Sequence, residues 1–154
     1  MKYWLPALIV LLSLQTGDAD QRIEKWDAFS SGEGSGAVDC RNCAEDEYIW
    51  LFCPMFSRQI DVSINGIVLK ETLKERTPIF ITFDVDGEKS SHPGTVSFSE
   101  MFGNIPKMAL AKDDPVLERL RKGRRLTVST SGASIDIGLA GSNAALEELI
   151  VGCE

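Results

Sequence analysis

The chain has 154 residues, of which 44% are hydrophobic, and its 16 Lys and Arg against 23 Asp and Glu give a formal net charge of −7. This length and apolar fraction are enough for one domain with its own core. The acidity argues against nucleic-acid binding, because a protein that binds phosphates needs a surface rich in Lys and Arg.

The chain begins with the pattern of a secretory signal. A short basic start precedes an apolar run from Trp4 to Leu14, and the small residues Gly17 and Ala19 stand where a signal peptidase cuts. This run is too short to cross a bilayer, which needs about 20 residues. We therefore predict a signal peptide over residues 1–19. The mature chain is expected to be periplasmic or secreted, with at most peripheral contact with a membrane.

All four cysteines, Cys40, Cys43, Cys53 and Cys153, lie in the part expected to be exported. An even number of cysteines in an oxidising compartment predicts two disulfide bonds. A bond from Cys153 to the N-terminal region should restrain the unfolded chain by roughly 4.7 kcal/mol, against about 2 kcal/mol for Cys40–Cys43. We expect Cys153 to join Cys40, Cys43 or Cys53, and the nested pairs Cys40–Cys153 and Cys43–Cys53 are one possibility. The spacing does not suit zinc, which usually takes two close pairs.

The segment before the first cysteine divides into two short stretches. A mixed, charged stretch around Trp26 predicts a first strand, and the glycines and serines from Ser30 to Gly36 are typical of a flexible linker. We therefore predict an N-terminal strand and linker over residues 20–39 and a disulfide-bonded domain over residues 40–154.

The next part of the chain has the periodicity of β-strands. Aromatic and β-branched residues from Glu47 to Cys53 predict a buried strand. Apolar and polar residues then alternate in several runs, two of which end in the turn dipeptides Asn65-Gly66 and Asp86-Gly87. The further strands are expected over residues 59–64, 67–69, 79–85, 95–98, 107–111, 126–130 and 135–139.

Two short helices are expected near the C-terminus. Asp114 followed by Pro115 is a strong helix start, and Gly123 ends that helix. A second helix is predicted over residues 144–151. Because strands and helices do not alternate, the sequence predicts a mainly β fold, an antiparallel β-sandwich or partial barrel with two short helices.

The C-terminal residues carry a recognisable pattern of capping and apolar residues. It consists of Asp114-Pro115-Val116-Leu117, Leu120, Lys122-Gly123, Leu139-Ala140-Gly141, Ala144-Ala145-Leu146, Leu149 and Cys153. This pattern resembles the C-terminal signature of the invasion-associated locus B family of exported bacterial proteins. The resemblance implies a compact β-sandwich with disulfide bonds, located in the bacterial envelope and without an established catalytic residue.

Two features have an enzymatic interpretation. Cys40 and Cys43 are spaced like a redox pair, but no helix start follows to activate a thiol, and acidic neighbours disfavour the thiolate. His92 is the only histidine and lies near Ser90, Ser91 and Glu88, the residue types that a hydrolase uses. However, the segment has the composition of a loop and no nucleophile-elbow motif. A thiol-disulfide oxidoreductase and a hydrolase are therefore alternatives, and we expect a solvated loop histidine.

Positive charge is concentrated at the end of the first predicted helix. One interpretation is a solvated helix end that compensates the helix dipole. The other is a docking surface for an acidic protein or an anionic surface. This cluster, which we call the basic cluster, consists of Arg119, Arg121, Lys122, Arg124 and Arg125.

These observations favour binding over catalysis. The sequence offers no set of metal ligands and no cofactor-binding loop, so neither a metal nor a cofactor is expected. We predict a non-enzymatic binding or accessory protein of the bacterial envelope whose partner is another envelope or secreted protein.

Overall fold

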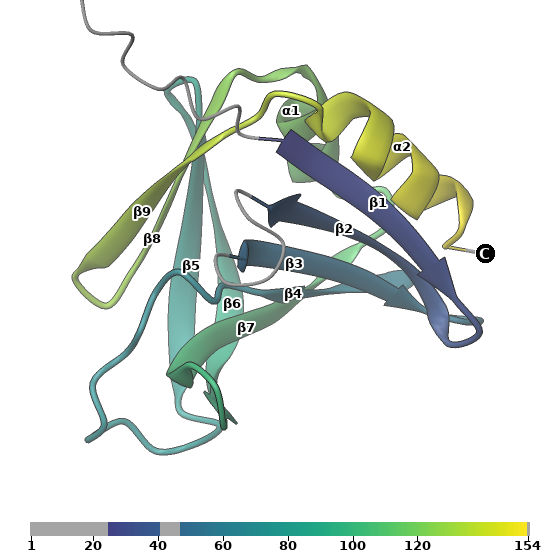
Figure 1. Cartoon of the computed structure of the whole chain (residues 1–154). Helices are drawn as coiled ribbons and strands as arrows, with labels where there is room; N and C mark the ends of the chain where they lie inside the picture. Colours follow the sequence, from purple (N-terminus) through teal and green to yellow (C-terminus); the bar gives the residue numbers. More distant parts are fainter. Residues whose placement is uncertain (1–24, 41–46, 154) are drawn as a thin grey trace, which may run out of the picture.

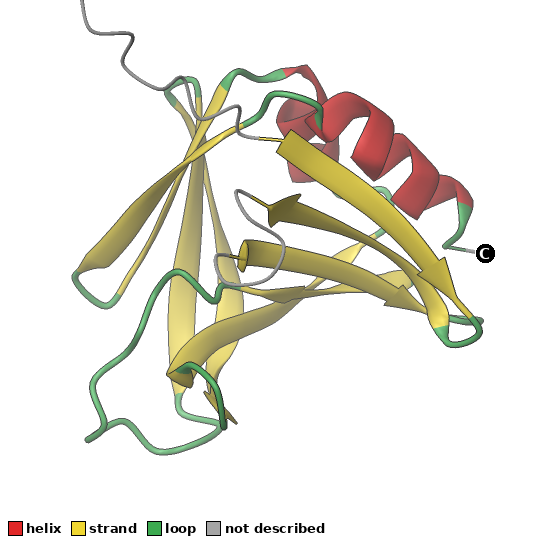
Figure 2. Ribbon diagram, viewed as in Figure 1, coloured by secondary structure: helices red, strands yellow, loops and turns green. Residues whose placement is uncertain are grey.

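The computed structural model describes residues 25–40 and 47–153. The predicted signal peptide and Cys43 lie outside these ranges. Figure 1 labels the elements, and Figure 2 shows how strongly strands predominate over helices. The described elements are β1 (Lys25–Ser31), β2 (Gly34–Cys40), β3 (Glu47–Pro54), β4 (Gln59–Ser63), β5 (Pro78–Val85), β6 (Glu88–Ser99), β7 (Gly103–Ala111), α1 (Pro115–Lys122), β8 (Arg125–Thr130), β9 (Ala133–Gly138) and α2 (Ser142–Val151).

The strands form one open sheet in the order β1-β2-β3-β4-β7-β6-β5-β8-β9, and every pair is antiparallel. The predicted mainly antiparallel β fold with two short helices is confirmed. The hydrogen bonds show neither the predicted sandwich nor the predicted partial barrel. Alternation along a strand gives its buried face but not its neighbour, and here the β4–β7 and β5–β8 pairs join all nine strands into a single sheet.

The sheet bends so that its two halves share one core. Figure 1 shows β1–β4 as one limb and β5, β6, β8 and β9 as the other, with β7 between β4 and β6 and α2 lying along β1. Trp26 of β1 links the two edge strands of the sheet, β1 and β9, through hydrogen bonds to the end of β9 and the residues after it. Its backbone N–H donates to the Ala140 carbonyl at 3.3 Å, and its indole Nε1 donates to the Gly138 carbonyl at 2.9 Å. The core draws on both limbs and both helices, including Leu51, Phe83, Val128, Leu120 and Leu149.

The segment predicted as a flexible linker is instead a β-hairpin. β1 and β2 pair from Lys25↔Cys40 to Ser31↔Gly34, so the glycines and serines lie in strands or in the turn between them. Gly36 pairs with Phe29 on one side and Phe52 on the other. A Cβ atom on Gly36 would lie 2.1 Å from the Phe29 ring. The glycine therefore provides space for aromatic packing, which composition alone does not reveal.

The start of α1 is fixed by a local cap, whereas the start of α2 is fixed by tertiary contacts. As predicted, α1 begins after Asp114, whose Oδ1 accepts a hydrogen bond from the Val116 N–H at 2.9 Å. α2 begins at Ser142, two residues earlier than predicted. The Ser142 hydroxyl lies 2.7 Å from the Leu120 carbonyl and 2.8 Å from the Leu139 carbonyl, which ties the start of α2 to α1. Neither helix is long and apolar enough to cross a membrane, among the residues that the structure describes.

A disulfide bond fixes α2 to the sheet. Cys153, just after α2, is bonded to Cys53 of β3, with 5.5 Å between the Cα atoms. This confirms that Cys153 joins an N-terminal cysteine and excludes the nested pattern, because Cys53 is no longer available to Cys43. Lys112 Nζ donates to the Cys153 carbonyl at 3.2 Å, and so places a cation near the C-terminal end of α2, whose own last turn has no basic residue.

Candidate functional site

The residues of the basic cluster lie close together, but several of their charges are paired with glutamates. Arg121 contacts Glu118 at 3.1 Å and Glu147 at 3.7 Å, and Lys122 Nζ lies 2.7 Å from Glu118. The pKa of Glu118 is lowered mainly by its hydrogen bond with Lys122, with further contributions from the charges of Lys122 and Arg121. Glu118 therefore stays ionised beside these cations. Much of this half of the cluster behaves as a compensated helix end.

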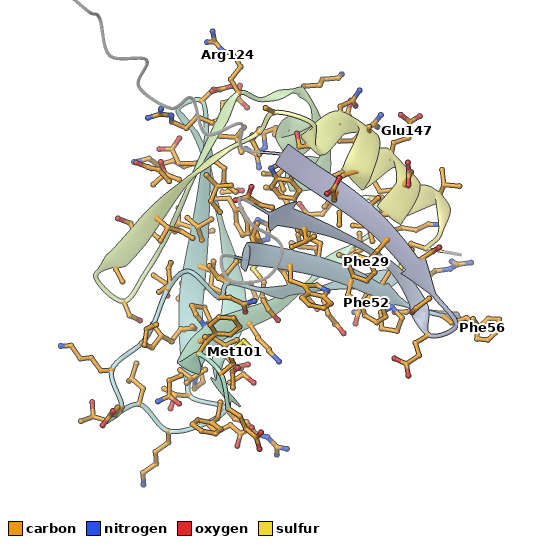
Figure 3. All side chains as sticks on the ribbon, in the orientation of Figure 1. Phe29, Phe52, Phe56, Met101, Arg124 and Glu147 are labelled. Carbon is orange, nitrogen blue, oxygen red and sulfur yellow. A yellow bond between two sulfur atoms is a disulfide. The ribbon has the colours of Figure 1, made fainter. Side chains whose placement is uncertain are left out.

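The other cations of the basic cluster differ in their exposure. Arg119 lies 4.0 Å from Glu88. The backbone N–H groups of Arg124 and Arg125 donate to the carboxylate of Asp86, at 2.9 and 3.2 Å. Neither of these two arginine side chains has an ion pair within the described ranges, and Figure 3 shows Arg124 pointing away from the fold. The cations available for docking are thus Arg124 and Arg125.

His92 lies in β6, so its prediction as a loop residue is wrong. Its pairing with Ile81 places it on a strand despite the loop-like composition of the segment, because the regular partner strand β5 supplies the hydrogen bonds. Its Nε2 lies 3.2 Å from Ser90 Oγ, and its Nδ1 lies 3.7 Å from Asp114 Oδ2. Its ring meets Phe83 edge-on, with 5.9 Å between the ring centres. The structure thus brings Ser90, His92 and Asp114 into one row.

The cysteines offer less for redox chemistry. Cys53 and Cys153 are bonded to each other and fully buried, so a substrate thiol does not reach them. The predicted redox pair is not described, because Cys43 and the side chain of Cys40 lie outside the described residues.

A site that the sequence did not indicate lies on the face of the sheet turned away from the core. A hollow of about 610 Å³, which we call the aromatic groove, is lined by residues of five strands, β1, β3, β4, β6 and β7, and by the turn between β6 and β7. Its first wall consists of three rings from β1 and β3, and its second wall of one ring at the end of β6 and one in the β6–β7 turn. The walls are Phe29, Trp50 and Phe52 on one side and Phe98 and Phe102 on the other.

The floor of the aromatic groove consists of β4 and β7, which lie between the two walls in the strand order. Asp61 and Ser63 of β4 and Ile105 and Lys107 of β7 line it. In β4, Asp61 and Ser63 alternate with the buried Ile60 and Val62. The floor is therefore the outer side of the same strands that form the core.

The first wall is a packed set of rings. Phe29 meets Trp50 edge-on with 5.3 Å between ring centres and stacks nearly parallel to Phe52 at 6.3 Å. Figure 3 shows Phe29 and Phe52 side by side. Gly36 lies between these two residues in the strand register, and its missing side chain lets the Phe29 ring lie close to the sheet. Rings held in this way lose little freedom when they bind a ligand.

Polar and charged side chains complete the lining. Glu33, Asp61 and Lys107 contribute charges, and none of them has an ion pair among the described residues. Ser31, Ser63 and Asn65 add hydrogen-bonding groups. Aromatic walls with a few polar groups are typical of binding sites. The described lining contains no His or Cys, so the groove provides neither a histidine base nor a cysteine nucleophile.

The groove could be found only in part from the sequence. The Glu47–Cys53 run predicted a buried strand, yet Trp50 is 37% exposed, and only the face with Leu51 and Cys53 enters the core. The one available sequence signal was the presence of aromatic residues on both faces of this strand, including the face that does not enter the core. Phe98 reaches the same hollow only because β4 pairs with β7, and no local pattern indicates that.

Comparison with known proteins identifies a solved structure with a similar fold. No protein-family model matches the sequence, and no curated protein is detectably similar to it. The crystal structure of invasion associated protein B from Bartonella henselae matches with a TM-score of 0.54 and 13% sequence identity, over 83% of this chain and 93% of that chain. At this identity the likeness establishes the fold alone. It confirms, at that level, the resemblance found in the C-terminal sequence, and the disulfide bond suggests an extracytoplasmic protein.

Proposed function

We propose that this chain is an exported, non-enzymatic binding protein of the bacterial envelope that contacts another protein through the aromatic groove. The predicted signal peptide and the disulfide bond support export. The observation that supports it most is the groove itself, where the exposed rings of Trp50 and Phe98 and the half-buried rings beside them lie near charges that have no ion pair in the described chain. Exposed aromatic residues at a rigid site supply most of the binding energy in many protein interfaces.

Site-specific photocrosslinking tests this proposal. We expect p-benzoylphenylalanine in place of Phe98 to crosslink to a partner protein in the envelope, and the same group in place of Phe80 not to do so. The two phenylalanines form a matched pair, because both are exposed, at 62% and 71%, and lie on the neighbouring strands β6 and β5. Only Phe98 lines the groove. Equal crosslinking from both positions, or none from Phe98, would contradict the proposal.

The same experiment separates the groove from the basic cluster. Trp50→Ala should abolish the Phe98 crosslink, whereas reversing Arg124 and Arg125 to Glu should leave it intact. Those two cations are exposed and unpaired in the described chain, so the reversal should change stability little. If the charge reversal removes the crosslink and Trp50→Ala does not, the basic cluster is the docking surface.

A hydrolase is the second candidate, and the row of Ser90, His92 and Asp114 is the observation that favours it. The order of contacts, Ser90 to Nε2 and Asp114 to Nδ1, is that of a catalytic triad. Against it, the distance from Asp114 Oδ2 to Nδ1 is 3.7 Å, beyond a hydrogen bond, and Asp114 Oδ1 already caps α1.

A fluorophosphonate probe distinguishes the two candidates. We expect no covalent label on the purified mature protein, because Asp114 is too far from His92 to hydrogen-bond to it and so does not orient it as a base for Ser90. A label that disappears in both Ser90→Ala and His92→Ala would establish an activated serine and replace the binding proposal with the hydrolase.

A further inference from the structure

We propose that the aromatic groove binds an extended, proline-rich segment in the polyproline II conformation that carries a basic residue. This inference rests on the proposed function and adds the chemistry of the partner. It follows from the two aromatic walls, from the backbone of the groove floor and from the charges at the groove.

The arrangement of the rings suits an extended occupant. Trp50 and Phe52 stand on one side of the β4–β7 floor, and Phe98 and Phe102 stand on the other. A polyproline II segment is narrow, with three residues per turn, and its proline rings are flat apolar surfaces. Such segments bind in grooves lined by aromatic side chains, where their preformed conformation reduces the entropy lost on binding.

The backbone of the floor disfavours an added β-strand. β4 and β7 pair with each other from Gln59↔Ala111 to Ser63↔Lys107, and β4 also pairs with β3. The groove therefore lies on the face of the sheet, where backbone N–H and C=O groups are already used by neighbouring strands. Strand addition needs a free sheet edge. A polyproline II segment makes its contacts through side chains and keeps its own backbone solvated.

The charges favour a basic residue in the ligand. Two carboxylates, Glu33 and Asp61, and one cation, Lys107, line the groove, and they form no ion pairs within the described part of the chain. The whole chain is also acidic. A Lys or Arg beside the prolines would meet this excess of negative charge, whereas an uncharged saccharide stacked on the rings would leave both carboxylates unpaired.

Fluorescence anisotropy with labelled peptides tests the inference on the mature protein. The probe is a decaproline peptide with one arginine at its C-terminal end, compared with neutral decaproline and with a Gly/Ser peptide of the same length and charge. We expect the arginine-containing decaproline to bind most tightly and the Gly/Ser peptide not to bind. Trp50→Ala should weaken binding by about tenfold or more, as expected for an aromatic hot spot.

Two matched variants complete the design. Asp61→Asn should weaken the binding of the arginine-containing peptide by roughly two- to fivefold at low salt and leave the binding of neutral decaproline unchanged. Phe80→Ala removes an exposed ring that does not line the groove and should change neither. Circular dichroism of each variant shows whether the fold is retained, and Asp61→Asn keeps the test valid if Trp50→Ala unfolds.

The results that would overturn the inference are distinct from those that would overturn the proposed function. Absence of peptide binding, equal binding of the Gly/Ser peptide, or tighter Trp50-dependent binding of an N-acetylglucosamine tetrasaccharide would refute the polyproline ligand. If a protein still crosslinks from Phe98 in that case, the groove remains a protein-binding site with another ligand chemistry. Loss of both the peptide binding and the crosslink refutes both proposals.

Discussion

Replacing Cys53 and Cys153 with alanine is expected to lower the free energy of unfolding by roughly 4.7 kcal/mol, because the bond closes a loop spanning 100 residues. A domain of this kind has only about 5–15 kcal/mol of stability in total. The double variant should therefore be partly unfolded or unfold at much lower urea concentration. Urea denaturation followed by circular dichroism, compared with the unmodified protein, measures the difference.

The matched control is the pair of cysteines closest in sequence. Cys40→Ser with Cys43→Ser removes at most a bond across a very short loop, and should cost no more than about 2 kcal/mol. If the Cys53 and Cys153 variant unfolds within about 1 kcal/mol of the parent, the long disulfide is not the main covalent restraint on this fold.

Phe83→Ala is expected to cost about 3–5 kcal/mol, the usual range for removing a buried phenylalanine. Phe83 lies in β5, is 1% exposed, and pairs with Val128 on one side and Ser90 on the other. It also supports the His92 ring from the core side. The variant leaves a cavity in the core at β5, the strand that packs against α1, so the melting temperature should fall on the order of 10–20 °C.

Phe80→Ala is the control for this prediction, because it makes the same chemical change on the same strand. Phe80 is 71% exposed and lies on the opposite face from Phe83. Its removal should change stability by no more than about 0.5 kcal/mol. If the two variants lose similar amounts of stability, the outer face of β5 is buried in solution, for instance by self-association. Sedimentation would reveal such self-association.

The predicted elements succeeded where the signal was local. Asp114, Pro115 and Gly123 fixed the limits of α1, because a helix cap depends on residues within one turn. Alternation located β4 and β5, since it reports one buried face. Composition misled for the β1–β2 hairpin and the first half of β6, where strand partners supply hydrogen bonds that outweigh weak intrinsic preferences.

Most of the candidate site could not be predicted from local sequence patterns. The basic cluster was found as a set of charges, and the pairing of Arg121 and Lys122 with Glu118 is local to α1. The contact of Arg121 with Glu147, by contrast, depends on the packing of α1 against α2. The aromatic groove needs rings from β1 and β3 to face rings at the β6–β7 turn. These residues are far apart in sequence, so only the strand order brings them to one surface.

The sequence by itself therefore determined the mainly antiparallel β class, the limits of α1, and the participation of Cys153 in a long-range disulfide. Each of these follows from short-range periodicity, capping or loop entropy. Only the tertiary structure decided that nine strands form one open sheet, that Cys53 is the partner of Cys153, and that five aromatic rings border one groove. The physical reason is that pairing between distant strands depends on the packing of the whole core, which no local segment encodes.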